Sequence, residues 1–243
     1  HLHGDHCFGL LGLLSTFGML GRTSRLKVFA PECYANLFEQ QMNFFMQGMT
    51  YEIEFVPVDT TQHKVVYEDH SVTVETVPLR HRVPCCGYIF REKPTLPHIR
   101  RDMIDYYGIS LSQINNIKNG ADWTTPEGDI VPNSRLVEPA DAPRSYAYCS
   151  DTCYLPNLYE RVKDVTVLYH ESTYTSENED RAKIYYHSTA RQAALVAQKA
   201  GAGRLLLGHY SARYNNENVL LEEAKAVFPE TYLSQEGMVF EVK

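Results

Sequence analysis

The first six residues of this 243-residue chain decide its fold and its chemistry: His1-Leu2-His3-Gly4-Asp5-His6. At the end of a strand the first two histidines point to the same side, because side chains alternate along a strand. Gly4 permits a tight turn, after which the aspartate and the third histidine face back toward the same space. Four potential ligands in six residues exceed what one segment gives to a single tetrahedral zinc ion. The motif therefore predicts two adjacent metal ions.

Histidine and carboxylate ligands favour zinc at such a site, with manganese or iron as possible substitutes. The simpler interpretation is a surface histidine cluster or the remnant of an affinity tag. Tags repeat histidine without an ordered Gly-Asp-His, so this interpretation explains the motif less well.

A two-metal site needs further ligands from distant strands, and three residues stand where such ligands are expected. His81, Asp151 and His209 each follow a predicted strand, where α/β folds place their chemistry. These strands are Ser71–Val77, Ser145–Cys149 and Arg204–Leu207. A single histidine at a strand end is most often structural, but the agreement of three such positions favours a site.

Strand-like and helix-like segments alternate along the chain, so we expect an α/β fold with two sheets sandwiched by helices. Ala190–Ala200 is the clearest helix, since Thr189 and Gln192 form a capping box before it and Gly201 ends it. The apolar run from Cys7 to Leu20 is too short to span a bilayer and is predicted as a core helix. The other expected strands are Leu26–Ala30, Glu52–Pro57, Lys64–Glu68, Gly87–Arg91, Val165–Tyr169 and Met238–Val242, and the other expected helices begin at Pro31 and near Glu217.

One domain is expected over residues 1–243, with an inserted arm at about 92–137. The arm contains prolines, is polar, and has two predicted short helices, Pro97–Tyr107 and Ser110–Asn119. From 91 to 137 there are six Lys/Arg and six Asp/Glu, so this segment is neutral. Trp123, Tyr106 and Tyr107 in the arm can stack on bases or pack within it.

The bulk composition restricts the class of protein and its compartment. A hydrophobic content of 44% supports a packed core and excludes a disordered chain. Six cysteines without a C-x-x-C pair favour a reducing, cytoplasmic setting. The net charge of −7 argues against nucleic-acid binding, because phosphates favour basic surfaces.

The opening motif is the signature of the metallo-β-lactamase superfamily, and within it the chain resembles the ribonuclease Z family. Five further elements, at His81, Ser150, His170, His187 and Gly208, resemble that family and follow its order along nearly the whole chain. They are His81 with Gly87-Tyr88, Ser150-Asp151-Thr152, His170-Glu171-Ser172-Thr173 with His187-Ser188-Thr189, and Gly208-His209-Tyr210-Ser211 with Arg213-Tyr214. The opening motif alone indicates only the superfamily, whereas the later motifs are specific.

This resemblance implies an αββα sandwich and a zinc-dependent endoribonuclease that trims the 3′ end of precursor tRNA. It implies two Zn²⁺ ions per subunit, one held by His1, His3 and His81 and the other by Asp5, His6 and His209, with Asp151 bridging them. It also implies a homodimer. The family has further strands before the opening motif, so we expect the natural protein to be longer.

The resemblance and the residues together suggest roles in the reaction. Asp5 accepts a proton from water, His187 donates one to the leaving 3′-oxygen, and Glu171 orients His187. Arg213 contacts a phosphate through its guanidinium fork, or alternatively forms a surface ion pair with Glu217. His170 is either buried support or an outer group of the site.

Two departures from the family pattern lie beside predicted ligands: Ser150 replaces glycine before Asp151, and Gly208 replaces threonine before His209. The neutral arm also lacks the family's Gly-Pro element. Two alternatives therefore stay open. The first is another hydrolase of this fold acting on small substrates, such as a cyclic-nucleotide phosphodiesterase or an arylsulfatase-like enzyme. The second is a non-catalytic binding subunit, which requires lost ligands.

Overall fold

The computed structural model describes residues 1–243 and has a seven-stranded mixed sheet at its centre. The strand order is β13-β12-β11-β10-β5-β4-β3. Their bounds are β3 (Val65–Glu68), β4 (Val72–Pro78), β5 (Cys86–Glu92), β10 (Ser145–Cys149), β11 (Val167–Glu171), β12 (Arg204–Gly208) and β13 (Thr231–Leu233). Strands β10 to β13 pair in parallel and β3 pairs antiparallel with β4. The predicted α/β class is confirmed.

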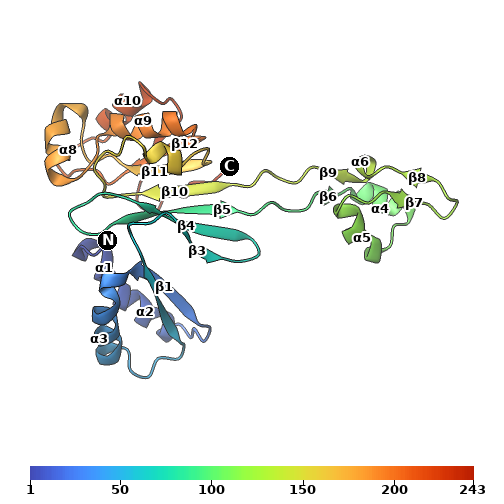
Figure 1. Cartoon of the computed structure of the whole chain (residues 1–243), viewed down its shortest axis with the longest axis horizontal. Coiled ribbons are helices and arrows are strands. Elements are labelled where there is room, and N and C mark those ends of the chain that lie inside the picture. The colour runs from blue at the N-terminus through green and yellow to red at the C-terminus, as the bar shows by residue number, and fades with distance from the viewer. The chain divides into compact units, whose positions relative to one another are not determined.

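Helices lie on both sides of this sheet (Figure 1). On one side, α9 (Ala190–Ala200) and α10 (Asn218–Lys225) cover the parallel strands, and the short α7 (Leu158–Arg161) packs beside α9. The small residues of α9 let it approach the sheet closely, and all of its buried residues are alanine or valine. Its predicted capping box and its glycine end are both present.

The largest hydrophobic core lies between α9 and the parallel strands. Strand β12 shows why: Leu205 and Leu207 face this core and are fully buried, and Leu206 between them is 8% exposed. A continuous apolar run is typical of a parallel strand that is covered on both faces. This buried core holds the strand ends, and with them the site residues, in fixed positions.

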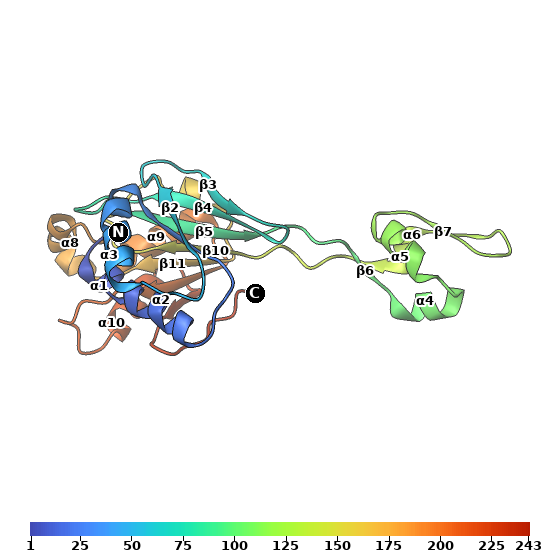
Figure 2. The ribbon, with the colours of Figure 1, turned by 90° about the horizontal axis from the view of Figure 1, so that it is seen from below.

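The N-terminal segment forms a smaller layer on the other side of the sheet (Figure 2). It consists of α1 (Gly4–Cys7), α2 (Gly9–Met19), the parallel strands β1 (Leu26–Pro31) and β2 (Ile53–Val58), a 3-10 turn (Glu32–Tyr34) and α3 (Ala35–Phe45). Leu14, Tyr34, Phe38 and Met46 form its core. Pro31 ends β1 and does not begin a helix, because the 3-10 turn intervenes.

The prediction of a core helix between Cys7 and Leu20 was wrong. The segment is helical, but it divides at Phe8, and Leu14 is its one buried residue. Phe8 is 82% exposed and Leu20 79% exposed. Apolar residues surround α2 on every side, while only one side contacts the small core of the N-terminal layer.

Residues 69–72 and 91–144 form a second compact unit. It contains α4 (Arg101–Tyr107), α5 (Leu111–Lys118), α6 (Asn133–Leu136) and two short antiparallel pairs, β6 (His98–Ile99) with β9 (Val137–Glu138) and β7 (Trp123–Thr124) with β8 (Ile130–Val131). Its core is Ile109, Ile117, Val131 and Leu136, with Tyr107 and Trp123 packed against it. The helix predicted from Pro97 begins only at Arg101, because the residues before it pair as β6.

Two further differences concern the C-terminal half. The strand predicted at Met238–Val242 is absent, because the edge of the sheet beside β12 is occupied by β13. Helix α8 (Glu179–Tyr185) and β13 were not predicted. No helix combines the length and the apolar character needed to cross a lipid bilayer.

Candidate metal centre

The carboxyl ends of three parallel strands bring predicted site residues to one edge of the sheet. Glu171 ends β11 and pairs with Gly208 of β12, while Cys149 of β10 pairs with His170. Asp151 comes two residues after β10 ends, and His209 comes one residue after β12 ends. The two residues therefore lie at similar positions along the strand direction, on either side of Glu171. This register explains why residues far apart in the sequence share one site.

The opening segment meets His81 beside this edge. The Nε2 atom of His1 lies 3.0 Å from Nδ1 of His3, and Nε2 of His81 lies 3.3 Å from the same atom. The other nitrogen of His81, Nδ1, is 3.1 Å from the carbonyl oxygen of Tyr186, to which it donates. Burial lowers the pKa of His81, which keeps the ring neutral. Three histidine ring nitrogens that converge on one point fit a zinc ion.

Asp151 lies between two further histidines and is 3% exposed. Its Oδ1 atom is 3.0 Å from Nε2 of His209, and its Oδ2 atom is 3.4 Å from Nε2 of His6. Burial opposes the charge of Asp151, but the hydrogen bond and the charge of His209 outweigh burial and hold the pKa of this carboxyl well below its usual range. Despite its burial, His209 has a raised pKa because of Asp151. A carboxylate whose two oxygens contact different histidines can serve as a shared metal ligand.

Six of the seven predicted ligands belong to groups whose ligand atoms lie within 4.8 Å of one another: His1 with His3 and His81, His1 with His6 and Asp151, and His209 with His187 and Glu171. Asp5 is the exception. Its side chain is 72% exposed, and its Oδ2 atom lies 3.6 Å from Nε2 of His6. Asp5 nevertheless lines the same cavity of about 290 Å³ as His3, His81, Asp151, His187 and His209.

His187 is fixed by a fully buried carboxylate. Nδ1 of His187 lies 2.9 Å from Oε1 of Glu171. Glu171 also accepts hydrogen bonds from the backbone amides of Thr152 and Ser188 and from the Thr173 hydroxyl. This network engages Nδ1 of His187 and leaves its Nε2 atom available at the cavity.

Two other predicted residues lie at the margin of the site. His170 is completely buried on the core side of β11; its Nδ1 atom donates to the Glu171 carbonyl oxygen at 2.8 Å and its Nε2 atom has no partner. His170 is therefore a buried residue that supports the end of β11 through this hydrogen bond. The Arg213 guanidinium lies 3.4 Å from Oδ1 of Asn178 and 5.6 Å from the ring centre of Tyr174, which lines the cavity.

Sequence reasoning missed three residues that position this site. The Thr173 hydroxyl is 2.8 Å from Nδ1 of His209 and so connects His209 to Glu171. The Ser150 hydroxyl donates to Oδ2 of Asp151 at 2.8 Å. A side chain at Gly208 would begin 2.0 Å from the Tyr169 hydroxyl oxygen. For Ser150 and Gly208 the sequence did contain a signal, because these are the two departures from the family pattern beside predicted ligands.

The backbone at two of these positions has an uncommon conformation. Asp151 has a φ of 55° and His209 a φ of 57°, in the left-handed region. Residues other than glycine rarely adopt it, although aspartate and histidine do so more often than most. Both residues turn the chain sharply just after a strand, and the turn aims each side chain at the other.

A mixed sheet between helical layers, with histidines and aspartates gathered at its carboxyl edge, defines a protein of the metallo-β-lactamase fold. Solved structures agree. The human tRNase Z short form superposes with a TM-score of 0.64 at 20% identity, over 100% of this chain and 77% of that one. The metallo-β-lactamase fold protein YhfI from Bacillus subtilis gives 0.62 at 18%, over 99% and 74%.

Curated relatives define the family. The chain is 51% identical to a ribonuclease Z of Bacteroides fragilis, over 98% of this chain and 78% of the relative. It is 49% identical to a ribonuclease Z of Phocaeicola vulgatus, over 100% and 79%. No family model matches the chain. The chain belongs to the ribonuclease Z family.

Proposed function

We propose that this chain is a metal-dependent endoribonuclease that removes the 3′ trailer of precursor tRNA by hydrolysing one phosphodiester bond. The observation that carries the proposal is the near-complete match to ribonuclease Z relatives, in a chain whose histidines and aspartates gather in one cavity. The two alternatives are disfavoured. A non-catalytic subunit would have lost ligands, whereas this chain keeps all seven candidates.

The proposed metals are two zinc ions, for which manganese can substitute. His1, His3 and His81 would hold one ion, Asp5, His6 and His209 would hold the second, and Asp151 would be shared between them. The convergence of ring nitrogens and the divided contacts of Asp151 support this assignment. Such ions supply, when bound, a water activated near neutral pH and positive charge beside the phosphoryl oxygens.

The chain's own residues provide the proton transfers. Asp5, exposed at the cavity, accepts a proton from the attacking water. Nε2 of His187 donates a proton to the leaving 3′-oxygen, because the hydrogen bond to Glu171 fixes the other ring nitrogen and with it the orientation of the ring. Arg213, above Tyr174 at the cavity, contacts a substrate phosphate through its guanidinium.

The protein acts in the cytoplasm as a homodimer in this proposal. Its six free cysteines are consistent with a reducing compartment. Several large apolar residues of the N-terminal layer are exposed, among them Phe8, Met19, Leu20 and Phe44, each at least 77%. Large exposed apolar side chains are available for a subunit contact. Light scattering at several protein concentrations tests the dimer, and a monomer at all of them contradicts it.

One observation favours the small-substrate alternative: the chain carries a net charge of −7, although RNA is an anion. The deciding experiment is cleavage of a precursor tRNA carrying a 3′ trailer by the metal-loaded natural protein. We expect a cut at the trailer, lost in His187→Ala and kept in His63→Ala. Hydrolysis of bis(p-nitrophenyl) phosphate without any tRNA cleavage would replace this proposal by the small-substrate one. Fewer than one metal ion per chain would support the binding-subunit alternative.

A further inference from the structure

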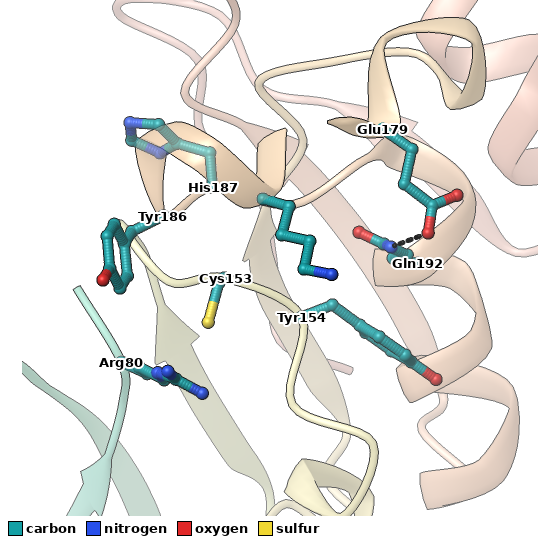
Figure 3. A pocket seen from close by; sticks show the side chains of 8 residues that line it. Arg80, Cys153, Tyr154, Glu179, Tyr186, His187 and Gln192 are labelled. Atoms are coloured by element: carbon teal, nitrogen blue, oxygen red, sulfur yellow. Dashed lines mark hydrogen bonds between the residues drawn. The ribbon is translucent and has the colours of Figure 1, made fainter. Parts of the chain in front are cut away.

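A second cavity, of about 380 Å³, adjoins the metal centre. Figure 3 shows Arg80, Tyr186 and His187 along one side of it, with Tyr154 on the other. Lys183 of α8 also lines it. The imidazole of His187 lies at its rim and points away from its middle (Figure 3). Apart from His187, the residues that line this cavity have no role in the proposed reaction.

His187 is common to both cavities, and each contains an arginine beside a tyrosine ring. In the second cavity the Arg80 guanidinium lies 6.0 Å from the ring centre of Tyr186. In the metal cavity the Arg82 guanidinium lies 5.3 Å from that of Tyr185. The two arginines flank His81 in the sequence, and the two tyrosines immediately precede His187. A ligand that crosses His187 therefore passes from one arginine–tyrosine pair to the other.

The lining of the second cavity suits one nucleotide of a single strand. Arg80 and Lys183 provide two positive charges, and Tyr154 and Tyr186 provide rings, the combination that binds single-stranded nucleic acid. Glu179 is the acidic group of the cavity, and its Oε1 atom accepts from the Gln192 amide at 3.1 Å (Figure 3). Its other oxygen is placed to accept from a base amine or a ribose hydroxyl. The volume lies within the range of small-ligand pockets.

We propose that this cavity binds the nucleotide that bears the leaving 3′-oxygen, the last nucleotide of the mature tRNA. The assignment rests on the proposed function. If His187 protonates that oxygen, the nucleoside carrying it lies next to His187, on the side away from the metals. Arg80 and Lys183 then contact the phosphate on the 5′ side of this nucleotide, and the tyrosines stack on its base.

The test pairs Arg80→Ala with one altered phosphate in the RNA. A precursor tRNA is prepared with a neutral methylphosphonate at the linkage immediately 5′ of the last tRNA nucleotide, and another with the same change one linkage into the trailer. We expect Arg80→Ala to raise KM by about tenfold on the normal substrate, with kcat within about twofold. The upstream methylphosphonate should raise KM similarly for the wild type and add little for Arg80→Ala. Such non-additivity indicates a direct contact.

Arg161→Ala, an exposed arginine on α7, is the matched control and should change neither constant. Thermal unfolding of each variant verifies that it is folded. Independent, multiplicative effects of Arg80→Ala and the upstream methylphosphonate overturn the proposal, as does coupling to the trailer linkage instead. If the wild type leaves the unmodified precursor intact, the proposed function itself fails, and the two failures are therefore distinguishable.

Discussion

Glu171 and His187 form a hydrogen-bonded pair at the centre of the site, with Oε1 of the buried carboxylate 2.9 Å from Nδ1 of the partly buried ring. They come from different segments: Glu171 ends β11, and His187 follows α8. Glu171 accepts from four donors and is completely buried. We therefore predict that Glu171 acts through His187 as a positioning residue.

Glu171→Gln is expected to lower kcat by about 10²- to 10⁴-fold, with little change in KM, because the ring of His187 is no longer held for proton transfer. The side-chain NH₂ of the glutamine would also face one of the four donors that contact Glu171, and this should lower the free energy of unfolding by about 1–3 kcal/mol. Steady-state kinetics on a precursor tRNA and thermal unfolding measure the two effects. Glu177→Gln, an exposed neighbour, is the control. A variant that raises KM alone contradicts the positioning role.

Asp151→Asn should lower zinc affinity by about 100-fold or more, because the amide cannot offer negative charge to two cations. The measurement is metal content after dialysis, together with the unfolding midpoint with and without a chelator. In the wild type the chelator should lower the midpoint, since a bound metal stabilises the folded state. Asp180→Asn on α8 should behave as wild type. Full metal content in Asp151→Asn is incompatible with a bridging ligand.

The cysteines should differ sharply in reactivity. Burial raises the pKa of both Cys85 and Cys149 to about 12, so at pH 8 neither forms the thiolate that reacts. Cys33 is exposed. We expect iodoacetamide at pH 8 to label Cys33 in the native protein and all six cysteines in urea, as read by peptide mass spectrometry. Rapid native labelling of Cys149 would show that the core under α9 opens readily.

His170 should make stability depend on pH. Burial lowers the pKa of His170 below its ordinary 6.5, so the unfolded chain takes up a proton that the folded chain refuses. Stability is therefore complete above about pH 6.5 and falls as the pH falls, with a slope of at most about 1.4 kcal/mol per unit. His170→Asn, which can still donate to the Glu171 carbonyl, should remove this slope. Chemical denaturation between pH 5 and 8 compares the two proteins, and parallel curves contradict the prediction.

The sequence predicted the parts of the fold that local chemistry determines. The α9 capping box and its glycine end depend on neighbouring residues, and both were foreseen. Helix α8 was not, because its charged residues show no apolar period. The error at Met238–Val242 has a tertiary cause: this segment and Thr231–Leu233 are both strand-like, and the edge of β12 accepts one of them.

The residues of the candidate site divide in the same way, into those that local sequence identifies and those that only the folded structure identifies. The residues in the opening motif and at the strand ends were recognisable because ligand types and spacing identify them. Thr173 was not singled out, because a threonine acquires its role only when the fold places it between His209 and Glu171. Arg80 and Tyr186 likewise become a pair through the meeting of two distant segments.

The left-handed backbone at Asp151 and His209 has a consequence for how this protein can evolve. Each position is one where glycine would relax the chain by about 1 kcal/mol, yet glycine would remove a side chain of the site. Selection for thermal robustness alone would thus push both positions toward glycine, whereas selection for catalysis opposes it. A descendant freed from its reaction should accept glycine at these two turns, so the residues found there indicate whether a lineage still uses its site.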